Sequence, residues 1–130
     1  MQIRRVYRGV LFSLAALALA ACGSRSSLPS RSIAVELTEF AITPNLYSAQ
    51  TGEPLAFVVM NKGVLDHNVT IIDPGGKELA HVEVKSGQTA TFDFQTSTPG
   101  SLQIICSIDG HHKAGMSAQL TVNDLSANAY

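Results

Sequence analysis

Short stretches of alternating or β-branched residues, each closed by a turn signal, constrain the fold of this chain most strongly. No segment after residue 31 keeps a helical period, and pairs such as Thr51-Gly52 and Pro99-Gly100 separate the stretches. The pattern predicts an all-β domain, a Greek-key sandwich or barrel of about eight strands. The expected strands cover residues 32–40, 45–50, 54–61, 67–73, 79–85, 89–95, 101–106 and 117–123.

The first 21 residues form a separate unit. Arg4, Arg5 and Arg8 precede an apolar, Ala-rich run that is short for a membrane span. This arrangement is typical of a secretory signal peptide, so we expect an exported protein. The remaining chain has the size of one compact domain, which we place at residues 32–124. A flexible Ser-rich tether at 22–31 precedes it, and a polar tail at 125–130 follows it.

The signal ends in Leu19, Ala20, Ala21 and Cys22, which resembles the lipobox of bacterial lipoproteins. Under this interpretation Cys22 is the lipidated first residue of the mature protein, and its acyl chains anchor the protein without spanning the bilayer. The expected location is the periplasmic or another extracytoplasmic face of a bacterial membrane. An ordinary signal with a chance cysteine and an uncleaved N-terminal anchor are the alternatives.

Charge is unevenly distributed along the chain. All the acidic residues follow residue 31, and the basic residues in that part are Lys62, Lys77, Lys85 and Lys113. Nucleic-acid binding needs clustered Lys and Arg to neutralise phosphates, so nucleic acid is not an expected partner. The acidic balance fits either steering toward basic partners or simple solubility.

Cysteine usage narrows the chemistry. If Cys22 carries lipid, Cys106 has no partner for an intramolecular disulfide. Exported compartments favour oxidation, so a lone thiol there is a buried core residue, a redox or catalytic group, or a metal ligand. His111 and Met116 follow within the run CSIDGHHKAGM and favour the metal ligand.

His67, in the run LDHNVTII, completes a set of one thiolate, two imidazoles and one thioether. This is the ligand set of a blue-copper electron-transfer site. Taken singly, each residue is better explained without a metal: Met116 as a core residue, Cys106 as a buried small side chain and His67 as a surface imidazole. Jointly they favour copper. Zinc is the competing metal, but a thioether is not a usual zinc ligand, so Met116 argues against it.

From about Ile33 to Val122 the chain resembles the cupredoxins, the family of plastocyanin and azurin. The resemblance rests on the runs FAITP at 40–44, FVVMNKG at 57–63 and DHNVTI at 66–71, and on the loop at 106–116. It implies one type 1 copper ion held by His67, Cys106, His111 and Met116, with Asn68 tying the two ligand-bearing segments together. His112 is the alternative to its neighbour His111, and we expect His81 at the surface.

The resemblance implies a monomeric electron-transfer protein and not an enzyme. It would move one electron between a donor and an acceptor through Cu(II)/Cu(I), with a cytochrome, a terminal oxidase or a reductase as partner. Its expected docking surface is the apolar end formed by Gly63, Val64, Leu65, Ala114 and Gly115. Catalysis by copper or thiol would need further histidines or a base in an open pocket. A lipid-anchored copper carrier that delivers or buffers the metal is the second hypothesis, and a metal-free structural lipoprotein is the third.

Overall fold

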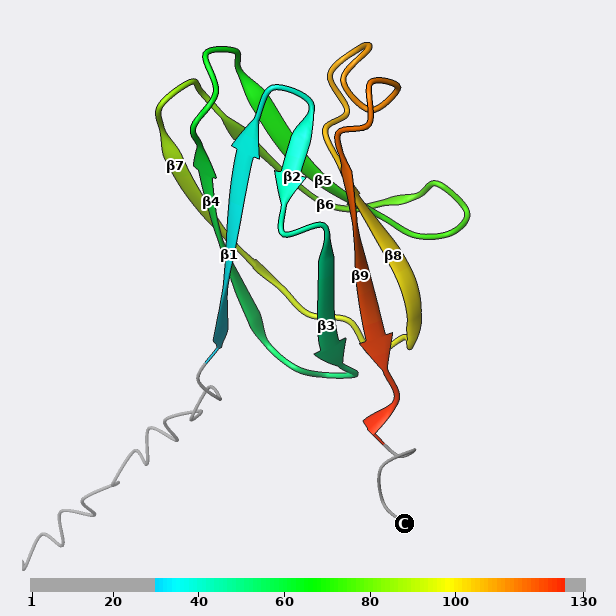
Figure 1. The fold of residues 1–130 in the computed structure, drawn as a ribbon. Helices are drawn as coiled ribbons and strands as arrows, with labels where there is room; N and C mark the ends of the chain where they lie inside the picture. Colours follow the sequence, from blue (N-terminus) through cyan, green and yellow to red (C-terminus); the bar gives the residue numbers. More distant parts are fainter. Residues whose placement is uncertain (1–29, 126–130) are drawn as a thin grey trace, which may run out of the picture.

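The computed structural model describes residues 30–125, which form two packed β-sheets (Figure 1). One sheet has the strand order β2-β1-β4-β7 and the other β3-β9-β8-β5-β6. This confirms the predicted β-sandwich. The strands of the described part are β1 (Arg31–Thr38), β2 (Ala41–Thr43), β3 (Leu46–Gln50), β4 (Leu55–Asn61), β5 (His67–Ile72), β6 (Glu78–Val84), β7 (Thr89–Phe94), β8 (Gly100–Ile105) and β9 (Ser117–Asn123).

The predicted strand at 32–40 ends two residues early, and one further strand was not predicted. β1 ends at Thr38, the chain reverses at Glu39 and Phe40, and β2 returns antiparallel to β1. Phe40 has a φ of 62°, in the left-handed region that residues other than glycine seldom adopt. The described part has nine strands instead of about eight, because β2 lies between the predicted strands at 32–40 and 45–50.

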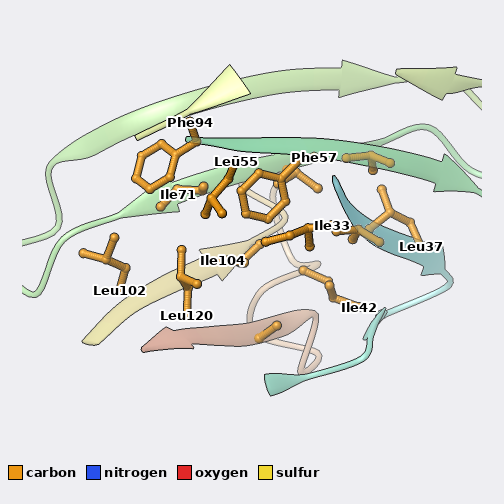
Figure 2. Packing of buried hydrophobic residues seen from close by; sticks show 14 of the residues in the cluster. Ile33, Leu37, Ile42, Leu55, Phe57, Ile71, Phe94, Leu102, Ile104 and Leu120 are labelled. Atoms are coloured by element: carbon orange, nitrogen blue, oxygen red, sulfur yellow. The ribbon is translucent and has the colours of Figure 1, made fainter. Parts of the chain in front are cut away.

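The core lies between the two sheets and follows the alternation of the strands. Leu55, Phe57 and Val59 of β4 are buried, and the residues between them are half-buried on the outer face. Phe57 stacks on Phe92 with ring centroids 5.0 Å apart. Figure 2 shows the apolar side chains of both sheets interleaved in this layer. Burial of this apolar surface is the main favourable contribution to folding.

Three segments meet at one end of the sandwich because of the strand register. β5 begins at His67 and runs antiparallel to β8, which ends one residue before Cys106. β8 pairs antiparallel with β9, and continuing their register sets Cys106 opposite Met116. The β1–β2 turn and the β8–β9 loop lie at this same end, the upper end in Figure 1.

The predicted signal segment, Cys22, most of the tether and most of the tail lie outside the described residues. Within residues 30–125, no helix is long and apolar enough to cross a membrane.

Candidate metal centre

His67, Cys106 and His111 bring their donor atoms within 4.8 Å of one another. The Nδ1 atoms of the two histidines are 3.2 Å apart. Cys106 Sγ lies 3.5 Å from His111 Nδ1 and 4.0 Å from His67 Nδ1. Among the described residues this is the one such group of three or more His, Cys, Asp or Glu side chains.

His67 is the first residue of β5 and is fully buried. Its burial, together with neighbouring His111, lowers the pKa of this imidazole. A lowered pKa favours the neutral form, which is the form that binds a metal.

The loop that leads into His67 is held by a buried amide. Asn61 Nδ2 donates to the carbonyl oxygens of Leu65 (2.8 Å) and Val84 (2.9 Å). Its Oδ1 accepts from the Gly63 amide at 2.9 Å. All three bonds hold backbone groups. The path of the loop before His67 is therefore fixed by the fold and does not depend on His67 itself.

Cys106 is a free, buried thiol directly after β8, and its amide donates to the Met116 carbonyl at 3.2 Å. The following residue is tied to β5, because Asn68 Oδ1 accepts from the backbone amide of Ser107 at 2.8 Å and from its hydroxyl at 3.2 Å. Asn68 therefore connects the strand that begins with His67 to the segment that carries Cys106.

His111 stands in a compact loop between β8 and β9. Its carbonyl accepts from the amides of Ala114 and Met116, both at 3.1 Å. The imidazole is half-buried and meets the ring of Phe40 edge-on, with centroids 5.4 Å apart. Met116, directly before β9, is fully buried. The loop thus leaves one imidazole partly exposed above a buried thiol and a buried thioether.

Comparison with known proteins agrees with this geometry. The sequence model described as "Cupredoxin-like domain" matches residues 9–122. The chain belongs to the cupredoxin-like family. The copper-resistant cuproprotein CopI of Pseudomonas aeruginosa is 26% identical, over 88% of this cupredoxin and 91% of that relative.

Two auracyanin structures share the fold. That of Roseiflexus castenholzii superposes with a TM-score of 0.66 at 19% identity, covering 72% of this chain and 97% of its own. Auracyanin A, a "blue" copper protein of Chloroflexus aurantiacus, has a TM-score of 0.60 at 16% identity, covering 71% and 99%.

The donor set of this cupredoxin fits copper. A thiolate with two imidazoles suits copper, whereas structural zinc usually takes a fourth Cys, His or carboxylate. No carboxylate of the described residues joins the cluster, and the fully buried residue beside it is a thioether, Met116. Family and donor chemistry together make copper the cofactor.

The two other histidines lie apart from the cluster. His112 is exposed and lines a shallow surface pocket with Asn45, Gln103 and Gln119. His81 is exposed on β6, with Nδ1 2.8 Å from the Thr70 hydroxyl and Nε2 3.0 Å from Glu83. Of the adjacent pair, the structure therefore brings His111 and not His112 to Cys106 and His67.

Sequence reasoning missed Asn61, Glu39 and Phe40 as neighbours of the site. A polar side chain at the end of the apolar β4 run was the available signal for Asn61. Glu39 Oε1 accepts from the amides of Val64 and Leu65, 25 and 26 residues away. No local pattern marks such a contact.

Proposed function

We propose that this cupredoxin is a lipid-anchored electron-transfer protein that passes one electron at a time between redox partners and is not an enzyme. The observation that carries the proposal is the enclosure of the donor set. Cys106, His67 and Met116 are fully buried, and only His111 reaches the surface. An enclosed site with one exposed edge suits an electron better than a substrate.

The proposed ligands have different chemical roles at the copper site. Cys106, His67 and His111 would hold the copper ion, and Met116 would add a weaker thioether ligand. Copper supplies a one-electron Cu(II)/Cu(I) couple in which no substrate bond is made or broken. The hydrogen bonds of Asn68 and Asn61 hold the ligand-bearing segments in one arrangement. Rigid support of this kind keeps the ligands from rearranging when the charge of the site changes.

The proposed exit for the electron is the edge of His111, at the apolar end of the sandwich. Val64 is 82% exposed and Leu65 43% exposed, and both belong to the loop before His67. Ala114 and Gly115, next to His111, are also exposed. Exposed apolar surface around a redox group supports docking of a partner protein there.

The partners are a protein donor and a protein acceptor, among which a cytochrome, a terminal oxidase or a reductase are candidates. The proposal places a monomer at the extracytoplasmic face of a bacterial membrane, held through lipid on Cys22. The run of apolar residues ending in Leu19, Ala20, Ala21 and Cys22 supports this location.

A copper carrier is the second candidate, and the relative named copper-resistant cuproprotein favours it. A carrier that exchanges its metal needs ligands that another protein can reach. Because His67, Cys106 and Met116 are buried, we expect the metal to exchange slowly, which favours the electron shuttle.

The visible spectrum of the purified full-length protein, with and without Cu(II), tests the proposal. An intense thiolate band that a mild reductant bleaches, that an oxidant restores and that Cys106→Ser lacks is expected. Copper retained through repeated redox cycles in the presence of a chelator would support the shuttle. Rapid loss to the chelator would support the carrier, and a protein without the band would overturn the proposal.

A further inference from the structure

The β1–β2 turn contacts both imidazoles of the site through consecutive residues. Glu39 Oε1 lies 3.9 Å from His67 Nε2. Phe40, the next residue, meets the ring of His111 edge-on. The turn depends on the left-handed conformation of Phe40, a backbone state that persists in folded proteins only where surrounding contacts hold it. One short turn therefore borders the two imidazole donors.

The orientation of His67 leaves one ring nitrogen without a partner. Its Nδ1 faces His111 Nδ1 and Cys106 Sγ, so Nδ1 is the atom available to a metal. The proton of the neutral ring then resides on Nε2. His67 Nε2 is buried and has no hydrogen-bond partner. A buried N–H group without an acceptor is unfavourable, which points to a partner engaged when the metal is bound.

Glu39 is held near this nitrogen by the loop before His67. Its Oε1 accepts from the amides of Val64 (2.6 Å) and Leu65 (3.2 Å). These bonds, the Leu65 amide first and then the Val64 amide, lower the pKa of the Glu39 carboxyl. The distance of 3.9 Å from Glu39 Oε1 to His67 Nε2 exceeds the length of a hydrogen bond by less than about 1 Å.

The contact with Gly63 shows how closely the carboxylate is fitted to the loop. A Cβ atom built on Gly63 would collide with the Glu39 carboxylate. Gly63 is buried, and its amide is already bonded to the side chain of Asn61. The loop before His67 thus forms a cradle around one carboxylate oxygen.

We propose that Glu39 is a positioning residue of the copper site, whose carboxylate accepts the Nε2–H of His67 and favours Cu(II) over Cu(I). This deepens the proposed function and rests on it. A carboxylate that accepts from the far nitrogen of a ligating histidine fixes the ring and increases its basicity. A negative charge at this position also stabilises the higher charge of the oxidised metal.

The reduction potential of the full-length protein tests this role in Glu39→Gln. The amide oxygen of Gln can still accept from the loop amides, so the variant removes charge while keeping the shape. Glu36→Gln is the matched control, since Glu36 lies three residues earlier on β1, pairs with Lys62 at 2.6 Å and is half-exposed.

We expect Glu39→Gln to increase the affinity for Cu(I) relative to Cu(II) by about tenfold. For a one-electron couple this corresponds to a rise in the reduction potential of about 59 mV. The control should shift it by less than about threefold, because the charge of Glu36 is offset by Lys62 and what remains is screened by salt. A potential that changes no more in Glu39→Gln than in Glu36→Gln would overturn the inference.

The His67 Nε2–H resonance of the diamagnetic Cu(I) protein provides a second readout that needs no variant to be stable. We expect this proton to exchange slowly and to carry the downfield shift of a charge-assisted hydrogen bond, and to lose that shift in Glu39→Gln. A Nε2–H without such a shift in the wild-type protein would contradict the inference. The thiolate band separates the two failures. If the band is present and the downfield shift is absent, only the role of Glu39 is wrong. If the wild-type protein lacks the band, the proposed function itself is wrong.

Discussion

The side-chain oxygen of Asn68 accepts the backbone amide of Ser107 at 2.8 Å, across 39 residues of sequence. This bond joins the second residue of β5, next to His67, to the residue after Cys106. The spacing between the segment with His67 and the segment with Cys106 thus depends on the buried side-chain amide of Asn68.

Replacing Asn68 with Ala should loosen this connection. The Ser107 amide would lose its partner, and we expect the free energy of unfolding to fall by about 1–3 kcal/mol. Copper should also dissociate faster in the presence of a chelator. Asn123→Ala is the control, since Asn123 bonds Ser48 and Ala49 at the opposite end of the sandwich. Equal copper loss from both variants would show that Asn68 acts only on stability.

Replacing Met116 with Gln should lower the reduction potential. A harder oxygen or nitrogen ligand at the axial position favours Cu(II), whereas a thioether favours Cu(I). Protein-film voltammetry measures the change. Met60→Gln, on the half-buried outer face of β4, makes the same substitution away from the site. If the two variants have the potential of the wild-type protein, Met116 is not an axial ligand.

Replacing Leu65 with Lys should slow electron exchange with a partner and leave the copper spectrum unchanged. Leu65 is 43% exposed beside the site, so a charge there disturbs docking without entering the core. Stopped-flow oxidation by a cytochrome measures the rate. Leu79→Lys places the same charge on β6 at a residue 38% exposed. Similar rates in the two variants would rule out the apolar end as the docking surface.

Acid should weaken the contact that fastens the start of β1. Arg31 Nε donates to Glu53 Oε1 at 2.5 Å, and this bond, together with the Gln50 amide, lowers the pKa of Glu53 below its usual 4.5. A carboxyl with a lowered folded-state pKa contributes stability above its unfolded-state pKa and loses it as the pH falls through the folded-state value.

Glu53→Gln should therefore lower stability at pH 7 by less than about 1 kcal/mol, since the pair is partly exposed. It should also flatten the fall in stability below pH 4.5. Urea unfolding between pH 3 and 7 measures both effects, with Asp93→Asn on β7 as the comparison. An unaltered pH profile in Glu53→Gln would mean that the ion pair contributes nothing in solution.

Much of the fold was predictable because it depends on local chemistry. Alternation of apolar residues located the strands now called β4 and β9, and the turn residues between strands marked their ends. β5 is less regular: its outward-facing Asn68 and Thr70 are buried too, because Ser107 and His81 cover them through hydrogen bonds. Alternation predicts which face a residue takes, but not what covers that face.

The candidate ligands could be selected from the sequence for a different reason. Few residue types bind copper, and Cys106, His111 and Met116 stand close together in sequence. The surroundings of His67 were not predictable in this way. Glu39 reaches it through a reversal at Phe40 that the extended pattern conceals, and its bonds span about 25 residues.

The direction of β1 determines which end of the domain adjoins the tether. Arg31 begins this strand at the end opposite the His67 and Cys106 segments, and the eight residues of β1 separate the two ends by about 26 Å. A lipid on Cys22 would sit at the far end of a ten-residue tether that reaches at most about 36 Å. With the tether extended, the proposed electron-exchanging edge would lie tens of ångströms above the lipid headgroups. Under the proposed anchoring, a membrane-bound donor or acceptor would meet His111 well beyond the bilayer, and lengthening or shortening the tether would change which partners lie within range.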